Sequence, residues 1–260
     1  MTSFSARLFI RDQADVATLA EQVKAGQVRA VSRAITLLEN QDPDGPAILH
    51  SLISGTQRAA VIGITGYPGA GKSSLVDRLV AAYRRLGKKV GVLAVDMSSP
   101  VTGGALLGDR IRMQDHALDS GVYIRSMATR GHHGGLARAT GGAALVLEAA
   151  GYEVILLETV GVGQGETDVL EAAQTVVAVV APGLGDEVQA MKAGLLEVAH
   201  LVVVNKGDHP GAETTLRDLR NWCSTVLRTV AVRGEGIPEL VAAIAGHQRL
   251  RGLEGFARSS

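Results

Sequence analysis

The sequence contains a single cysteine, few aromatic residues and no excess of charge of either sign. One cysteine excludes an internal disulfide and a metal site built from several cysteines, so we interpret Cys223 as a structural thiol near the end of a helix. Lys and Arg total 26, Asp and Glu total 26, and aromatic residues make up 3% of the chain. These values argue against a nucleic-acid-binding protein, which relies on positive charge and aromatic stacking.

Long hydrophobic runs are also missing. No run reaches the roughly 18 apolar residues of a membrane-spanning helix, and the N-terminal segment MTSFSARLFIRDQ lacks the apolar stretch of a signal peptide. We therefore expect a cytoplasmic protein that does not bind a membrane.

Glycine, by contrast, is abundant, at 32 of 260 residues. Many of these glycines follow apolar runs, where loops at strand ends would meet a ligand.

The chain begins with helical patterns and continues with a longer alternating part. Apolar positions recur at helical spacing over 12–40 with a break at Gly26, which predicts two helices joined by a turn. A short helical segment is expected at 46–54. From Ala59 onward, short apolar runs rich in β-branched residues alternate with helical stretches. We predict strands at 59–65, 88–96, 121–127, 153–159, 175–181, 200–206 and 226–232.

This alternation predicts an α/β fold with a mostly parallel central sheet flanked by helices. Strands that are apolar throughout are typical of strands covered on both faces. We divide the chain into an N-terminal helical extension (1–57), a nucleotide-binding domain (58–247) and a short C-terminal tail (248–260). Ligands of such sheets bind beyond the carboxyl ends of the strands, and each motif below lies at such an end or in the loop that follows it.

The run GYPGAGKS at 66–73 fits the G-x-x-x-x-G-K-[ST] phosphate-binding loop, between a predicted strand and a predicted helix. Its glycines let backbone N–H groups face phosphate oxygens, and the helix N-terminus adds partial positive charge. A dinucleotide-binding loop is disfavoured because the G-x-G-x-x-G spacing is absent. The chain is therefore predicted to be a P-loop NTPase. Its expected phosphate-binding residues are Gly66, Pro68, Gly69, Ala70, Gly71, Lys72, Ser73 and Ser74.

Within this loop, we expect Lys72 to reach the β- and γ-phosphates and Ser73 to place its hydroxyl on Mg²⁺. Mg²⁺ prefers oxygen ligands, and three acids lie where such a site needs them. Asp96 and Glu158 end predicted strands, and Asp109 lies in a glycine-rich segment. The alternative for each acid is a helix cap or a solvated charge.

Gly161 follows Glu158 by three residues, and its backbone N–H is a candidate sensor of the γ-phosphate. Val162, rather than a glutamine, comes directly after this glycine, and Gln164 lies two residues further on. A glutamine that positions the attacking water is therefore not evident. Because such sites hydrolyse slowly without an added cation or positioning group, we expect slow turnover that a mobile loop or a partner accelerates.

The run NKGD at 205–208 follows an apolar strand and fits the N-K-x-D guanine motif. The Asp208 carboxylate can accept hydrogen bonds from both N1–H and the 2-amino group of guanine, neither of which adenine offers. Asn205 can bridge to the base edge and neighbouring loops, and the stem of Lys206 can cover a face of the ring. Ala231 is a weaker candidate for donating its N–H to guanine O6. Together with the phosphate loop, this run predicts binding of GTP and GDP.

Several segments resemble the MeaB/ArgK/MMAA family, the GTPase chaperones of adenosylcobalamin-dependent acyl-CoA mutases. The resemblance runs from about Arg29 to His247 and is more specific than the generic GTPase motifs. It is carried by SRAITLLEN (32–40), GITGYPGAGKSS (63–74), SSPVTGGALLGDRIRM (98–113), ETVGVGQGE (158–166), PGLGDEVQAMKAG (182–194), VVNKGD (203–208) and GEGIPEL (234–240).

The resemblance implies a GTP-dependent gate for delivering adenosylcobalamin to a mutase of the methylmalonyl-CoA mutase type and for protecting that enzyme. By the same resemblance, Ser73, Asp96, Asp109 and Glu158 match the family's Mg²⁺ and switch positions. The 182–194 segment matches a switch loop that senses the mutase, in which Asp186 and Lys192 match residues that communicate with the nucleotide site. Lys192 is thus a candidate for the missing cation, and its alternative is a solvated helix position. The expected catalytic residues are Lys72, Lys192 and Glu158.

The chain departs from the family pattern at three places. Met97 replaces a usual proline, and RSMATRGHHGG replaces a usual RPSPSRGTLGG, which keeps Arg130. The pair His132 and His133 in that segment suggests a metal site or, as we prefer, a solvent-facing pair. The family normally continues past the position of Ser260 into a helical dimerisation arm. We therefore expect either a homodimer formed differently or a monomer.

Three other functions compete with the mutase chaperone. A P-loop small-molecule kinase is disfavoured by the guanine motif and by the lack of an arginine-rich lid. A GTPase metallochaperone for nickel enzymes would favour a Cys/His cluster, and one cysteine with a histidine pair supports it poorly. A nucleotide-dependent binding module that barely hydrolyses GTP stays open.

Overall fold

A computed structural model of the chain describes residues 13–53, 59–96, 116, 118–128, 135–159, 170–183 and 198–257. Its centre is a seven-stranded sheet in the order β3-β2-β4-β1-β5-β6-β7, and every pair of neighbouring strands is parallel. The predicted parallel α/β sheet is therefore confirmed. The strands are β1 (Ala60–Thr65), β2 (Val90–Asp96), β3 (Val122–Ala128), β4 (Val154–Thr159), β5 (Thr175–Val180), β6 (Leu201–Val204) and β7 (Val226–Arg228).

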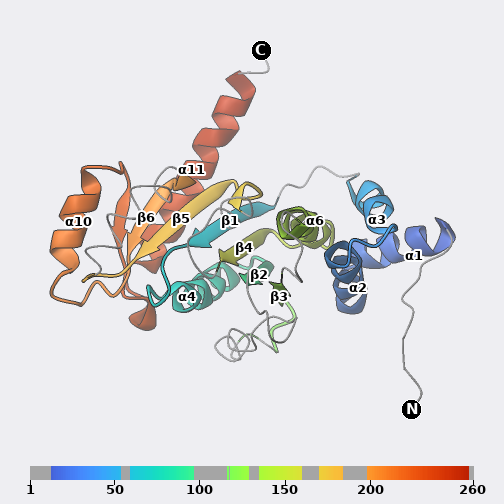
Figure 1. Cartoon of the computed structure of the whole chain (residues 1–260), viewed down its shortest axis with the longest axis horizontal. Coiled ribbons are helices and arrows are strands. Elements are labelled where there is room, and N and C mark those ends of the chain that lie inside the picture. The colour runs from blue at the N-terminus through green and yellow to red at the C-terminus, as the bar shows by residue number, and fades with distance from the viewer. Residues whose placement is uncertain are drawn as a thin grey trace.

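Helices cover both faces of this sheet (Figure 1). On one face, α4 (Lys72–Arg85) and α11 (Ile237–Ala257) share a core with the strands, and on the other face lie α6 (Gly135–Ala149) and α10 (Ala212–Arg220). All residues of β4, β5 and β6 are buried. Burial on both faces explains why these strands are apolar throughout rather than alternating.

Three N-terminal helices extend the layer formed by α6 (Figure 1). They are α1 (Gln13–Lys24), α2 (Val28–Glu39) and α3 (Gly45–Leu52), and a turn with Gly26 at φ 71° joins the first two. Their buried residues, such as Val23 and Ile35, belong to the same apolar core as Leu147 of α6. The apolar faces of the extension are therefore buried against the nucleotide-binding domain.

Two elements near the C-terminus differ from the sequence-based expectation. Strand β7 ends at Arg228 instead of 232, and the chain then forms a 3₁₀ turn, η2 (Ala231–Arg233). Gly234 and Gly236 adopt positive φ, and Val230 forms an antiparallel bridge with Glu235, which turns the chain away from the sheet. Helix α11 continues through the expected boundary at 247, so the first part of the tail belongs to this helix.

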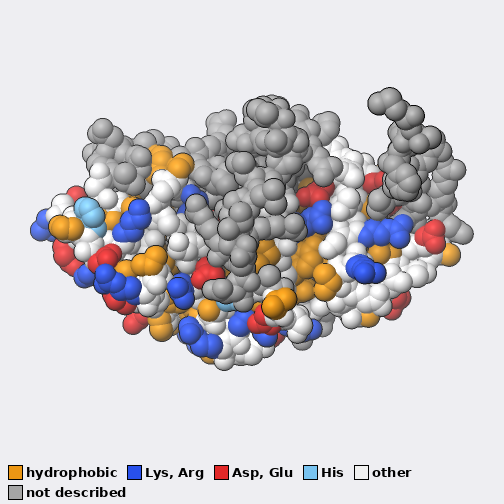
Figure 2. All heavy atoms as spheres, turned by 90° about the horizontal axis from the view of Figure 1, so that it is seen from below, with side chains coloured by type: hydrophobic (Ala, Val, Ile, Leu, Met, Phe, Trp, Pro, Cys, Tyr) orange, Lys and Arg blue, Asp and Glu red, His pale blue; other side chains and the backbone are white. Residues whose placement is uncertain are grey.

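The surface carries no single-sign charge patch on the described part of the face shown in Figure 2, where Lys and Arg side chains alternate with Asp and Glu. This agrees with the balanced composition. Among the described helices, none is long and apolar enough to cross a membrane.

Cys223 lies just after α10, packs against the apolar cluster of β5, β6 and α10, and is partly buried. Burial raises the pKa of its thiol, which keeps it in the unreactive protonated form.

Candidate functional site

The loop between β1 and α4 has the geometry of a phosphate cradle. Gly66, Gly69 and Gly71 all adopt positive φ, at 139°, 80° and 92°. A Cβ atom at Gly66 would lie 2.1 Å from the carbonyl oxygen of Val179, and one at Gly71 would lie 2.3 Å from the side-chain nitrogen of Asn205. Only glycine fits these two positions, because both the backbone conformation and the space exclude a side chain.

Lys72 opens α4, and its ammonium group is held inside the loop. Its Nζ donates to the carbonyl oxygens of Gly66 at 2.6 Å and Tyr67 at 3.1 Å, and the residue is 7% exposed. Pro68 and Gly69 form a turn in the same loop, and the N–H of Ala70 closes it by donating to the carbonyl of Tyr67 at 3.2 Å. The loop therefore places one buried cation beside the N-terminus of a helix, where an anion is favoured.

The next residue of α4, Ser73, joins the phosphate loop to β4. Its hydroxyl donates to Oε1 of Glu158 at 2.7 Å, and Glu158 is 3% exposed. Glu158 reaches this position because β4 lies between β1 and β2, so that it pairs with Ile64 on one side and Ala94 on the other. A hydroxyl and a carboxylate in contact supply the hard oxygen donors that Mg²⁺ prefers. These two residues therefore fit the metal expected from the sequence.

The other residues predicted for this part of the site are only partly described. Asp96 is the last residue of β2, at the same edge of the sheet as Glu158, although its side chain lies outside the described residues. Ser74 lies half-buried in the first turn of α4. Several predicted residues lie entirely outside the described part of the chain: Asp109, His132, His133, Gly161, Asp186 and Lys192. Within the described part, no cluster of three or more His, Cys, Asp or Glu side chains could hold a metal.

Asn205 connects the phosphate loop to the loops that follow β6 and β7. Its side-chain nitrogen donates to the carbonyl of Ala70 at 2.9 Å. Its side-chain oxygen accepts from the hydroxyl of Thr229 at 3.1 Å and from the N–H of Ala231 at 3.0 Å. Asn205 is 3% exposed, so these bonds form away from solvent. One buried amide thus fixes the distance between the candidate phosphate and base sites.

The Ala231 N–H expected to face guanine O6 is therefore bonded to Asn205 in this structure. Donation to a base would require Asn205 to release it, and this role of Ala231 stays a prediction. Lys206 is exposed and adopts φ 55°, a conformation rare outside glycine. This turn ends β6 two residues earlier than expected and brings Asp208 to the surface beside η2.

Asp208 is paired with a residue that sequence reasoning missed. Nη2 of Arg233 donates to Oδ2 of Asp208 at 3.1 Å, and the two side chains are 58% and 41% exposed. No motif singles out Arg233, because it lies 25 residues after Asp208 and directly follows the last predicted strand, 226–232. Its position after the last strand, in a stretch of glycines, was the available signal.

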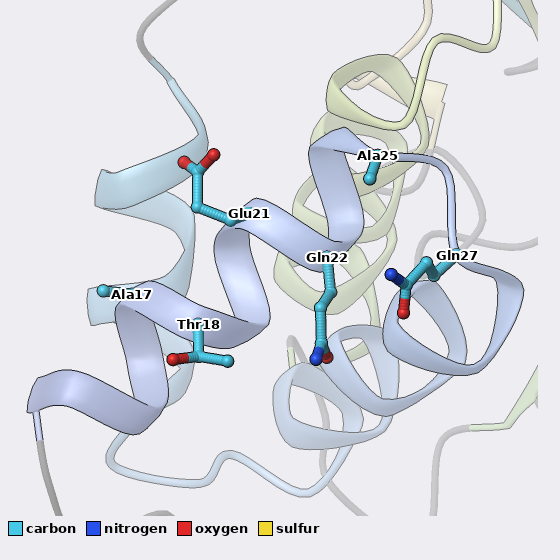
Figure 3. Close-up of a pocket in the computed structure, with 6 residues that line it drawn as sticks. All are labelled: Ala17, Thr18, Glu21, Gln22, Ala25 and Gln27. Carbon is cyan, nitrogen blue, oxygen red and sulfur yellow. The ribbon is translucent and has the colours of Figure 1, made fainter.

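A separate shallow hollow lies on α1, far from these loops in the sequence (Figure 3). It is lined by small and polar side chains, including Thr18, Glu21 and Gln22. It contains none of the predicted site residues. The candidate functional site is therefore the edge of the sheet where β1, β4 and β6 end.

Comparison with known proteins shows the family to which this chain belongs. Residues 31–259 match the family model described as methylmalonyl-CoA mutase-associated GTPase MeaB. A putative GTPase of Pyrococcus horikoshii is 49% identical over 244 residues, which cover 89% of this chain and 77% of the relative. The mitochondrial methylmalonic aciduria type A homolog of Caenorhabditis elegans is 37% identical over 212 residues, covering 76% of this chain and 53% of that protein.

Among solved structures, the crystal structure of a LAO/AO transport system kinase is similar over 96% of this chain and 85% of its own. The TM-score is 0.69 and the sequence identity is 26%. The similarity extends over the helical extension as well as the sheet, since it spans nearly the whole chain. The family match and the GTPase relatives show that the chain is a GTPase, and the loops at this edge of the sheet are its candidate nucleotide site.

Proposed function

Because the chain belongs to the MeaB family of methylmalonyl-CoA mutase-associated GTPases, we propose that its GTP cycle gates the loading of adenosylcobalamin into an acyl-CoA mutase and protects that enzyme. The observation that carries this proposal is the extent of the family match, residues 31–259. A general GTPase similarity would be confined to the sheet and its loops. Here the match also takes in most of α2 and all of α3, which lie outside the nucleotide loops.

In this proposal the phosphate loop binds the triphosphate through its N–H groups and Lys72. Lys72 exchanges at least one of its carbonyl partners, Gly66 or Tyr67, for a phosphate oxygen. Mg²⁺, when bound, neutralises phosphate charge, and Ser73 and Glu158 would hold it, with Asp96 and Asp109 as the further candidates. Gly161 and Lys192 keep their proposed roles as sensor of the γ-phosphate and as catalytic cation.

The contact between Ser73 and Glu158 is compatible with the proposed Mg²⁺ site. The Ser73 hydroxyl now donates to the carboxylate. A hydroxyl that donates its hydrogen keeps two lone pairs, so the Ser73 oxygen could ligate Mg²⁺ with this contact in place. We propose slow hydrolysis by the isolated chain and faster hydrolysis with its mutase, since Val162, rather than a water-positioning glutamine, follows Gly161 in the sequence.

A pull-down from the source cell, with the protein loaded with GTP or with GDP, tests the chaperone role. We expect a cobalamin-dependent acyl-CoA mutase to be recovered in amounts that differ between the two nucleotides. The Lys72→Ala protein serves as the control bait, because it should lose the nucleotide dependence. Recovery of a nickel enzyme, without a mutase, would overturn the proposal and favour the metallochaperone.

Asp208→Asn is expected to shift nucleotide preference from GTP toward XTP. The asparagine amide can donate to the O2 of xanthine, while it loses the charge-assisted bonds to N1–H and the 2-amino group of guanine, worth about 1.5–3 kcal/mol each. Competition binding with GTP, XTP and ATP measures the change. Asp218→Asn on the exposed face of α10 is the matched control and should leave the preference as it is. An unchanged preference in Asp208→Asn would show that this loop does not read the base.

A further inference from the structure

The pair between Arg233 and Asp208 joins two loops at the candidate base site. Asp208 ends the guanine motif after β6, and Arg233 ends η2 after β7. The second nitrogen of the guanidinium, Nη1, lies 3.8 Å from Oε1 of Glu235. Arg233 is therefore held between two carboxylates, one of which is the proposed reader of guanine.

The backbone that carries Arg233 is itself fixed to the rest of the site. The N–H of Arg233 donates to the carbonyl of Val230 at 2.9 Å, which closes the 3₁₀ turn. The preceding carbonyl, of Val232, accepts from the Arg78 guanidinium of α4 at 3.4 Å, and Ala231 is bonded to Asn205. The guanidinium thus extends from a braced turn, which limits the positions it can offer to Asp208.

A carboxylate has about four lone-pair positions on its two oxygens. Guanine needs one on each oxygen, for N1–H and for the 2-amino group. Arg233 contacts Asp208 through one nitrogen and one oxygen, Nη2 and Oδ2, so the remaining positions stay available to a base. The arrangement therefore restrains the rotation of the carboxylate without using the acceptors that guanine requires.

We propose that Arg233 is a positioning residue that aligns the Asp208 carboxylate for the two hydrogen-bond donors of guanine, and so sharpens selection of the 2-amino group. This inference rests on the assignment of 205–208 as the guanine loop and is independent of the partner that the GTPase serves. Arg233 supplies orientation, and Asp208 makes the contact with the base.

The test compares GTP with inosine triphosphate, which keeps N1–H but lacks the 2-amino group. In Arg233→Ala we expect the ratio of GTP to inosine triphosphate affinity to fall about two- to fivefold, the range that exposed ion pairs give in double-mutant cycles. Arg233→Lys should recover part of the loss, because lysine keeps the charge but not the planar fork. A loss that affected both nucleotides equally would indicate a general electrostatic effect and would overturn the proposal.

Two further variants separate the possible outcomes. In an Asp208→Ala background the ratio should be low already, and Arg233→Ala should not change it further; an additional fall there would overturn the proposal. Lys88→Ala removes another exposed ion pair, with Glu153 at 2.7 Å near the opposite edge of the sheet, and should leave the ratio unchanged. Tighter GTP binding in Arg233→Ala would contradict the proposal by showing that Arg233 blocks the carboxylate. If wild-type protein prefers ATP to GTP, the guanine assignment itself fails.

Discussion

Lys72→Ala is expected to abolish tight binding of GTP while the protein stays folded. Nζ of Lys72 is the one described cation inside the phosphate loop, and the fold holds it at the N-terminus of α4 by bonds to the carbonyls of Gly66 and Tyr67. Charge-assisted bonds are worth about 1.5–3 kcal/mol each, and Lys72 is proposed to contact two phosphates. A loss of about a hundredfold or more in affinity follows, since about 1.4 kcal/mol corresponds to a factor of ten.

Isothermal titration with GTP and GDP measures this loss, and a thermal melt checks the fold. The fold should survive, because the strands and α4 retain their apolar cores without the ammonium group. Lys72→Arg should bind weakly too, because a planar guanidinium does not reproduce the contacts of the compact ammonium group. Lys88→Ala, which removes an exposed lysine, is the control and should bind as the wild type does. Retained nanomolar-to-micromolar binding of GTP by a folded Lys72→Ala protein would contradict the assignment of the loop.

The parallel sheet and the places where its motifs lie could be predicted from the sequence because both depend on local patterns. Buried strands such as β4 and β5 read as continuous apolar runs, and the phosphate loop needs glycine where φ is positive. The position of Glu158 beside Ser73 follows from the parallel sheet, since residues at the carboxyl ends of neighbouring strands meet at one edge. These features combine a local pattern with one general rule of topology.

Other features could not be predicted, because they depend on contacts between distant segments. Strand β7 ends early because of the bridge from Val230 to Glu235, and the pattern of apolar residues through 232 does not reveal it. Arg233 matches no motif, and only the folded turn shows that it faces Asp208. The roles expected for 98–113, 158–166 and 182–194 stay predictions. Of these segments, the structure describes only Glu158, Thr159, Pro182 and Gly183.

A second distant contact attaches the N-terminal helices to the sheet. Arg125 of β3 donates to the Glu39 carboxylate, to the Thr36 hydroxyl at 2.9 Å and to the carbonyl of Ser32 at 3.1 Å, all on α2. The hydroxyls of Tyr123 and Ser32 lie 3.1 Å apart and add a further bond between the same two elements. The Arg125 side chain is 17% exposed and that of Glu39 is 5% exposed. This network is a largely buried ion pair with hydrogen bonds around it.

Arg125→Ala is therefore expected to lower the free energy of unfolding by about 3–5 kcal/mol, the usual cost of removing one partner of a buried pair. The loss arises mainly because the Glu39 carboxylate stays buried without its cation. Urea denaturation measures it, and Lys88→Ala, which breaks an exposed pair, should cost no more than about 1 kcal/mol. Replacing both partners, Arg125→Met with Glu39→Leu, should recover most of the stability, because no charge is then left buried.

The double replacement also separates two roles of this network. If the pair mainly holds α2 against β3, the double variant should restore protection of α2 backbone amides from hydrogen exchange together with stability. If the pair instead orients the end of β3, the double variant should regain stability, but its GTP turnover should still differ from that of the wild type. A single Arg125→Ala variant that lost less than about 1 kcal/mol would show that water reaches Glu39 easily, because only solvation could replace the lost cation at so little cost.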